Sequence, residues 1–516
     1  MKNSSSTSDI TPSVTVTPAG RLWLLQHVAL AVALTVGFYG LALVVSLGLF
    51  LIAYATLTAW NSVDAAVISL CLASLCVACG LSILWSIGPR RYRFGPPGPR
   101  LDPAGDPDLF AVIQDVATAT SQAMPADVYV INGVTAFVGQ YGGVMGFRSR
   151  RVMGLGLPLM HAVSVQQLKA ILAHEFGHYC SGHAVLGPWI RKTYAAIDRT
   201  INGLSKSTLD KIFVSYGLLF IRVTQAVSWH HVRLADEIGA RVAGADAMIS
   251  GLQRVRAAAA AFYGYWQAEL GPIFGSGFRP PVNAGFVRYL DSPEVSAAIE
   301  GLVQHEEAER RSIGSLAHPS LHDRIAAIAF LPSNAGFDDR PAACLLSNPD
   351  ELEDRVLTFV SLDLGARKRV DWEHVAEIVY VPIWQKRVAG YSRLLGSCTI
   401  ATVPVARNDL LRIGSSLFTT YETPSDDVRI VRAWELIIGA IGVALLPLGW
   451  TPEKRPGSEV SLNRDGLKLQ PWSELNAMTG GRITRAEWRA RCVDLGIADV
   501  PLAAAADEGL KPSPKG

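Results

Sequence analysis

His174-Glu175-Phe176-Gly177-His178 is the stretch that decides how the middle of this 516-residue chain is built. Residues four apart lie on one face of a helix, so the imidazoles of His174 and His178 can bind one metal ion together. The glutamate between them then stands beside the metal, where it can accept a proton from the attacking water. The pattern therefore predicts a zinc site with His174 and His178 as ligands and Glu175 as the catalytic base.

The residues before this motif predict a helix independently of the motif itself. Ser164 and Gln167 have the spacing of a capping box, which fixes a helix N-terminus. An apolar stripe at helical spacing, over residues 168–172, then leads into His174. Both signals place the two histidines on the same helix face.

Short strands are expected between a helix at residues 108–122 and the motif. The alternation of apolar residues predicts strands at 127–131, 135–138 and 151–157, with turns at Asn132-Gly133 and Gly142-Gly143. An extended peptide can add to the edge of such a sheet through its backbone. We therefore expect Thr135, Ala136 and Phe137 to bind substrate.

Two long apolar runs near the N-terminus predict a membrane hairpin. The first extends from Leu22 to Leu57 and the second from Val63 to Ile87, and each exceeds the roughly 20 residues that a spanning helix needs. The linker at 59–62 carries no Lys or Arg. A cleaved signal peptide is disfavoured because the first run is too long and a second span follows at once.

Basic residues flank both outer ends of this hairpin. Lys2 and Arg21 precede the first span, and an arginine-rich segment at 90–100 follows the second. By the positive-inside rule, the N-terminus and the main body lie in the cytoplasm, at the inner membrane if the protein is bacterial.

Two later apolar stretches leave several interpretations open. Residues 212–228 contain Arg222 near their middle, so an interfacial or buried helix competes with a span. Residues 436–450 are uncharged but short, which fits a third membrane helix, a core helix or a re-entrant element.

Composition limits the function classes. The formal net charge of +2 gives no case for nucleic-acid binding, and 49% hydrophobic against 18% charged residues leans away from a purely soluble enzyme. The seven cysteines show no disulfide framework, and Cys71, Cys76 and Cys79 fall inside an apolar run, where they pack as small hydrophobic residues.

The expected fold class is α+β and mostly helical. The predicted organisation is a disordered N-terminus at 1–20, two transmembrane helices within 21–90 and a zincin-like peptidase domain at 105–330. An extension at 331–450 holds the candidate membrane helix 436–450, and a polar region at 451–516 ends in a disordered tail.

The central part resembles integral-membrane gluzincin zinc metallopeptidases of the HtpX and CAAX prenyl endopeptidase type. The resemblance rests on 127–143, on Gly154-Leu-Gly-Leu157, on 173–183 and on His318-Pro319-Ser320 with Arg324-Ile325. It implies one zinc held by His174, His178 and a glutamate from a later E-x-x-A-D segment. Aligning that segment on Ala235-Asp236 puts Val232 at the glutamate position, which is a departure from the family.

Four residues are candidates for the missing third ligand. His231 is preferred, although on a helix it points about 100° away from position 232. Asp236 comes second, and in the family this aspartate orients a ligand histidine. Glu237 starts a shifted pattern, and His318 can approach from its loop. Without a third ligand the protein is a degenerate relative that binds or scaffolds.

The sequence thus predicts a membrane-bound zinc endopeptidase that hydrolyses membrane or membrane-proximal polypeptides. Its partners are polypeptide substrates and the lipid bilayer, with no nucleic acid. The resemblance implies that Arg324 or His318 stabilises the oxyanion. The alternative is a catalytically degenerate peptidase-fold membrane protein.

Overall fold

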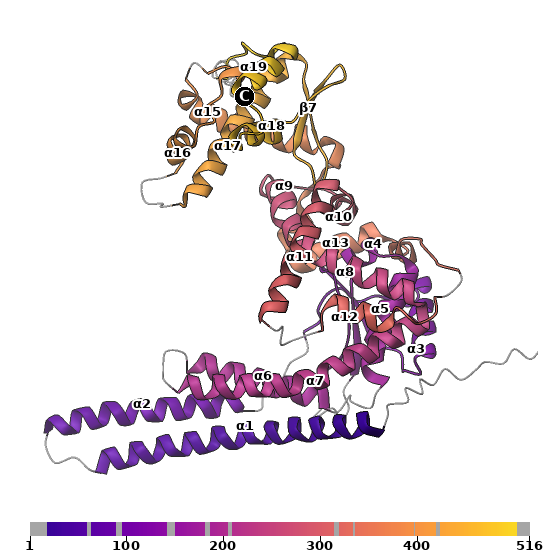
Figure 1. Cartoon of the computed structure of the whole chain (residues 1–516), viewed down its shortest axis with the longest axis vertical. Helices are drawn as coiled ribbons and strands as arrows, with labels where there is room; N and C mark the ends of the chain where they lie inside the picture. The colour runs from indigo at the N-terminus through magenta and orange to yellow at the C-terminus, as the bar shows by residue number, and fades with distance from the viewer. Residues whose placement is uncertain are drawn as a thin grey trace, which may run out of the picture. The chain divides into compact units, whose positions relative to one another are not determined.

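The computed structural model describes residues 18–58, 63–88, 95–141, 150–180, 186–204, 209–313, 319–333, 336–396, 398–418 and 424–502. The expected disordered segments therefore lie mostly outside the described residues, as does His318. The mostly helical α+β fold is confirmed (Figure 1). The chain forms two compact units, and segment 257–301 belongs to the second of them.

The first unit comprises Met1–Arg256 and Leu302–Pro349. Its elements are α1 (Pro18–Thr58), α2 (Val63–Ile87), α3 (Pro107–Ala119), β1 (Asp127–Ile131), β2 (Ala136–Tyr141), β3 (Arg150–Gly156), α4 (Leu157–Ala162), α5 (Val165–Cys180), α6 (Leu186–Gly203), α7 (Asp210–Ala243), α12 (Leu321–Ile328) and η2 (Ala342–Leu345). Helices α8 (Ala245–Gly264) and α11 (Pro293–Ile313) each have residues in both units.

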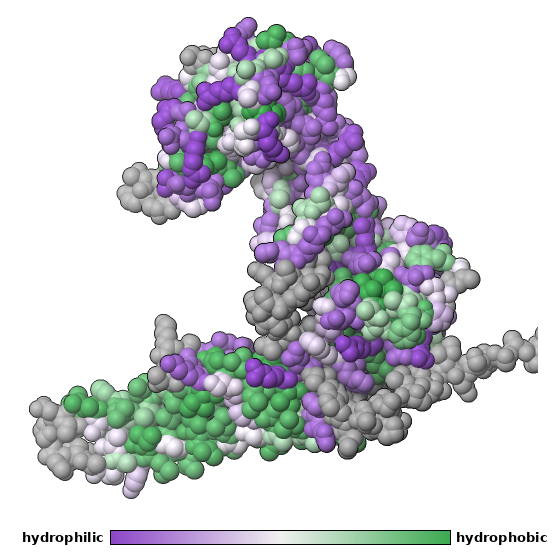
Figure 2. Space-filling model, viewed as in Figure 1, coloured by the Kyte–Doolittle hydropathy of each residue, from purple (hydrophilic) through white to green (hydrophobic). Residues whose placement is uncertain are grey.

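The predicted apolar hairpin is helical throughout, as α1 and α2. Figure 2 shows a nearly continuous hydrophobic surface along these two helices. By length and composition, four helices in the described part of the chain can cross a membrane: α1, α2, α7 and α17 (Asp426–Leu445) with the turn that follows it. Only 22% of the most apolar window of α1 or α2 is buried, so their apolar surface is free to meet lipid.

A three-stranded sheet in the order β1-β3-β2 supports the motif helix. β1 has the predicted bounds and pairs in parallel with β3, whereas β2 pairs with β3 in antiparallel register. β2 begins at Ala136 and runs to Tyr141, three residues beyond the predicted strand. The ring of Phe137 lies over Gly154, where a Cβ atom would come within 2.3 Å of it, so this glycine accommodates the aromatic ring across the strands.

The capping box at the start of α5 is confirmed. The backbone N–H of Ser164 donates to Gln167 Oε1 at 3.0 Å, and the N–H of Gln167 donates to Ser164 Oγ at 3.2 Å. The two bonds fix the first turn of α5, three turns before the motif histidines.

The second unit comprises Ala257–Gly301 and Asp350–Gly516. Its longer helices and its three-stranded sheet are α10 (Val282–Leu290), α13 (Pro349–Val360, whose first residue belongs to the first unit), α15 (Val381–Tyr391), α16 (Arg407–Ser415), α17, β6 (Thr451–Lys454), β7 (Val460–Arg464), β8 (Leu467–Leu469), α18 (Pro471–Thr479) and α19 (Arg485–Asp494). The shorter ones are η1 (Tyr265–Leu270), α9 (Gly271–Gly275), β4 (Phe278–Arg279), α14 (Leu362–Ala366), β5 (Lys368–Arg369), η3 (Trp372–His374), η4 (Ala376–Tyr380), η5 (Ser392–Leu394), η6 (Ile400–Thr402) and η7 (Leu446–Leu448).

Helix α17 contains most of the stretch at 436–450 that was a candidate for a third membrane helix. In its most apolar window 61% is buried inside the unit. Trp434, Ile437 and Ile441 belong to a hydrophobic core shared with α15, α16 and α19. Because packed side chains already cover this surface, the structure favours the core-helix interpretation.

Candidate metal centre

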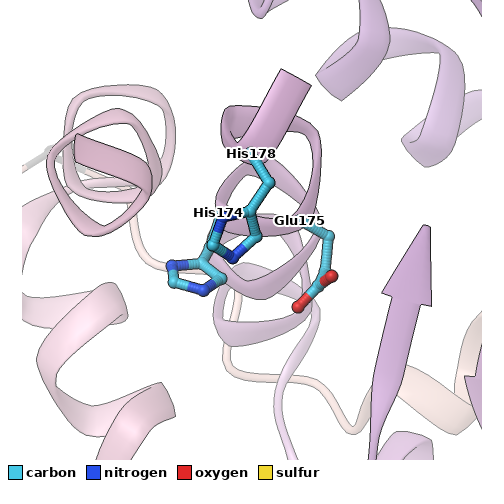
Figure 3. A group of neighbouring side chains, drawn as sticks. All are labelled: His174, Glu175 and His178. Atoms are coloured by element: carbon cyan, nitrogen blue, oxygen red, sulfur yellow. The ribbon is translucent and has the colours of Figure 1, made fainter. Parts of the chain in front are cut away.

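Three side chains of α5 converge on one point. The ligand atoms of His174, Glu175 and His178 all lie within 4.8 Å of one another, and in the described residues they form the one group that could hold a metal ion (Figure 3). The two imidazole rings are edge-to-face, with centroids 4.8 Å apart. The helical spacing of the motif thus brings two imidazoles and a carboxylate together on one side of the helix.

A glycine lets a second helix approach this point closely. A Cβ atom at Gly177 would lie 3.0 Å from the Cα of Ala235, so α5 and α7 pack almost backbone to backbone here. The next residue on α7, Asp236, is completely buried. The close packing of α7 against α5 therefore places the Asp236 carboxylate on the side of the motif helix that faces α7.

The Asp236 carboxylate is held from two sides. Its Oδ1 lies 2.8 Å from His174 Nδ1. Arg324, on α12, donates from Nη2 to Oδ1 at 2.7 Å and from Nε to Oδ2 at 2.8 Å. Both oxygens are engaged, which speaks against the expected role of Asp236 as a metal ligand. The guanidinium is likewise engaged in a bidentate pair, rather than free for an oxyanion.

The residue at position 232 does not identify a third metal ligand. Val232 is 8% exposed and offers no ligand atom. His231, beside it on α7, is close enough for its charge to lower the pKa of His178, but it lies outside the group of three. Glu237 pairs with Arg241 one turn along the same helix. His318 falls outside the described residues.

Burial tunes the two ionisable groups nearest the metal position. Burial raises the pKa of Glu175, an effect that His174, the Val138 N–H and Arg324 partly oppose. Burial also lowers the pKa of His178 to about 3, with His174 adding to the shift. His178 is therefore neutral at physiological pH, which is the form that binds a metal.

The edge of the sheet is joined to the motif helix at one residue. The carbonyl of Val138 on β2 accepts a hydrogen bond from the Tyr179 hydroxyl at 2.7 Å, and its N–H donates to the Glu175 carboxylate. The guanidinium of Arg151 covers the Tyr179 ring at 4.6 Å. Sequence reasoning missed Tyr179, and its place directly after His178 is the one local signal that could have found it.

The predicted substrate residues lie on or just before this strand. Thr135 precedes β2, Ala136 opens it, and Phe137 pairs with Gly154. Among the described strands, β2 is at the edge of the sheet. A peptide can therefore reach its outer side at Ala136, whereas Val138 already bonds to α5.

The comparisons with known proteins agree with the resemblance to zinc metallopeptidases that the sequence motifs indicate. Residues 103–330 match the sequence profile of peptidase family M48. This region belongs to peptidase family M48. A Protease HtpX from Acinetobacter baylyi is 32% identical over 123 residues, which cover 19% of this chain and 40% of the relative. Proteins of that name from two strains of Acinetobacter baumannii, AYE and SDF, are 28% identical over 120 residues.

The M48 match covers the centre of the chain and leaves much of it without a counterpart. The aligned part makes up about 40% of the length of these relatives. No solved structure matches the chain. The M48 region contains every residue of the candidate metal centre, from Thr135 to Arg324.

Proposed function

We propose that this protein is a membrane-bound zinc endopeptidase that hydrolyses peptide bonds of membrane or membrane-proximal proteins. The observation that carries the proposal is the half-buried His174-Glu175-His178 group with Asp236 and Arg324 behind it. Metal-binding histidines typically donate their second ring nitrogen to a carboxylate, which fixes the tautomer and the ring orientation. Asp236 occupies that place at His174, so we assign it as a positioning residue.

His174 and His178 would hold the zinc, with His231 as our candidate for the third ligand. His231 is adjacent to Val232 on α7, and a local rotation of about 100° or a broken turn would be needed to bring it in. Two histidines alone would bind zinc weakly, because catalytic sites usually keep three protein ligands. The donor set thus fits the metal in part, and His231 is the residue that would complete it.

The chain's own residues supply the remaining chemistry. Bound zinc would act as a Lewis acid that polarises the scissile carbonyl. Glu175 would accept a proton from the attacking water and pass it to the leaving amine, and the raised pKa suits both transfers. β2 would hold the substrate as an added strand from Thr135 to Phe137. The flanking positive charges would place this domain in the cytoplasm.

A second candidate function is favoured by one specific observation. The side chain at 232 is a buried valine, not a carboxylate. A peptidase-fold protein that binds polypeptides without cleaving them would keep the sheet edge and the helix packing and would tolerate this change.

Metal analysis of the full-length protein in detergent separates the two. About one zinc per chain, lost in His174→Ala and kept in His374→Ala on the exposed surface, supports the peptidase; a correctly folded protein without metal excludes it. Loss of zinc in His231→Ala but not in the neighbouring His230→Ala would support His231 as ligand. Casein cleavage that is abolished in Glu175→Gln would then support the catalytic base.

A further inference from the structure

Helices α6 and α7 contact the α1–α2 hairpin at one level, which here means one height along the length of the hairpin. The Tyr216 hydroxyl donates to the Leu34 carbonyl at 2.6 Å, and Phe213 contacts Phe38 with ring centroids 6.3 Å apart. On the other helix of the hairpin, Arg199 donates from Nε and Nη2 to the Ser86 carbonyl at 3.1 and 3.0 Å. These contacts put the end of α6 and the start of α7 beside the part of the hairpin nearest the peptidase domain.

Beyond this level the hairpin continues alone. From Phe38 to Thr58 on α1, and from Val63 to Ser82 on α2, each helix extends by about 30 Å at 1.5 Å per residue. That length equals the thickness of the bilayer hydrocarbon core. Residues 39–58 and 65–82 contain no Asp, Glu, Lys or Arg. Their exposed side chains include Val44, Leu47, Leu51, Ile68, Leu70 and Leu75.

Aromatic residues mark the two ends of this uncharged section. Tyr54, close to the C-terminal end of α1, is 70% exposed, and Trp85, beside the Ser86 carbonyl that Arg199 binds, is 77% exposed. Tyrosine and tryptophan gather at both membrane–water interfaces because their rings are amphipathic. The contact level of α6 and α7 therefore coincides with one interface.

The charges of α6 and α7 fit an interface and not a span. Lys192 and Asp198 on α6, and Lys211 and Arg222 on α7, all project from exposed positions. Trp189 and Tyr194 also lie on the outer side of α6. Arg199 lies at Ser86 and Gly203 at Ser82, so α6 runs antiparallel to α2. Phe213 lies at Phe38 and Tyr216 at Leu34, so α7 runs antiparallel to α1. The last residues of α6 and the first residues of α7 are therefore the parts of these helices nearest the bilayer, where charged and aromatic side chains favour the headgroup region. The collar is defined as α6 with residues 210–222 of α7, whose exposed side chains also include Ile212, Val214, Leu218 and Leu219.

We propose that the protein crosses the bilayer only through α1 and α2, and that the collar stands on the headgroup layer on the side of the peptidase domain, with the last residues of α6 and the first residues of α7 at the lipid. Its partner is the lipid surface, which Lys211, at the start of α7, meets with positive charge. Helix α7 is apolar enough to span by composition, but its first residues reach only the interface.

The same helix then sets the height of the metal centre. One continuous helix joins Tyr216, in the collar, to Asp236, at the metal centre, and about 30 Å of helix separates them. The centre thus stands up to about 30 Å from the interface. This height has a consequence for the substrate, which rests on the proposed function. The cleaved bond lies in a part of the substrate chain that extends up to about 30 Å from the bilayer.

Cysteine labelling tests the topology without any need for activity. In a variant whose seven native cysteines are replaced by serine or alanine, single cysteines are introduced as Asn202→Cys in the collar, Asp115→Cys in the peptidase domain and Thr58→Cys at the far end of α1. A membrane-impermeant maleimide is applied to sealed vesicles of both orientations. We expect Asn202→Cys to react from the same side as Asp115→Cys and Thr58→Cys to react from the opposite side.

Reaction of Asn202→Cys from the side of Thr58→Cys would mean that α6 crosses the bilayer, and reaction only after detergent would mean that it lies within the hydrocarbon. Either result overturns the proposal. Spin labels give a second measurement that does not depend on vesicle orientation. At Lys211→Cys we expect access to a water-soluble nickel relaxant, and at Leu47→Cys access to oxygen only. Oxygen-only access at both positions would contradict the proposal equally.

Discussion

His174 Nδ1 lies 2.8 Å from Oδ1 of Asp236, so the metal centre is tied to a second helix through one carboxylate. Arg324 holds the same carboxylate from α12. Three segments far apart in the chain therefore meet at one buried charge. The arrangement fixes the orientation of His174, which we propose as a metal ligand, and its disruption should have measurable effects.

Substitution of the carboxylate by an amide should weaken zinc binding. In Asp236→Asn the contact with His174 Nδ1 loses its charge, and outer partners of this kind are worth about 10- to 100-fold in metal affinity. Zinc competition with a fluorescent chelator measures the change. Glu237→Gln, one residue along on α7, is the matched control and should keep the native affinity. Native affinity in Asp236→Asn would show that the contact does not orient the ligand.

Removal of the arginine should cost stability as well as metal affinity. Arg324→Ala leaves the Asp236 carboxylate, which is 0% exposed, with one partner fewer, and the loss of one member of a buried ion pair costs about 3 kcal/mol. Thermal unfolding in detergent measures it. Arg324→Lys should recover little, because lysine lacks the bidentate fork. The double variant Arg324→Ala with Asp236→Asn should be less destabilised than the sum of the single variants; additive losses would contradict the pairing.

The glycine inside the motif should resist substitution. Gly177→Ala places a methyl group 3.0 Å from the Ala235 backbone, so α5 and α7 must separate by a few tenths of an ångström. We expect a lower melting temperature and weaker zinc binding. The control is Gly301→Ala on α11, where no atom lies within 4 Å and where alanine should stabilise the helix by about 0.5–1 kcal/mol. Equal effects of the two substitutions would contradict the close packing.

A buried glutamate in the second unit should make stability depend on pH. Glu353 accepts hydrogen bonds from the Val282 N–H at 2.9 Å and the Asn283 N–H at 2.8 Å, yet burial raises its pKa above 4.5. Because the folded state then holds the proton more tightly than the unfolded state, this group's contribution to stability falls as pH rises from 4.5 through the folded pKa.

Comparison of melting temperatures between pH 4.5 and 7 tests this. Glu353→Gln cannot ionise and should lose the part of the pH dependence that wild type owes to this residue. Parallel curves for the two proteins would show that Glu353 does not titrate in this range.

The proposed height of the candidate metal centre predicts which membrane-anchored chains the proposed peptidase would cut. Model substrates with a single span and an unstructured linker of varied length should be cleaved only when the scissile bond lies about nine or more extended residues from the span, since each residue covers at most about 3.3–3.6 Å. A soluble peptide of the same sequence shows whether the enzyme is active at all. Cleavage two or three residues from the span, with the soluble control also cleaved, would place the centre at the bilayer surface.

The sequence by itself determined the elements whose signals are local. The helix with His174 and His178 follows from a capping box and a 3.6-residue period, and the strand 127–131 follows from a short β-rich run between turn residues. The two membrane helices follow from the unbroken length of their apolar runs, because a helix in a soluble protein does not need so long an apolar stretch. Each of these signals lies within some tens of residues, and so it can be read without knowledge of the fold.

Only the tertiary structure decided which distant residues meet. The pairing of Asp236 with His174 and Arg324, the bond from Tyr179 to Val138 and the burial of α17 all depend on how helices pack. An aspartate on a helix face has the same local sequence whether it binds a metal or orients a ligand, and an apolar helix has the same composition in a core as in a bilayer. What distinguishes these cases is the neighbouring surface, which residues far away in the chain provide.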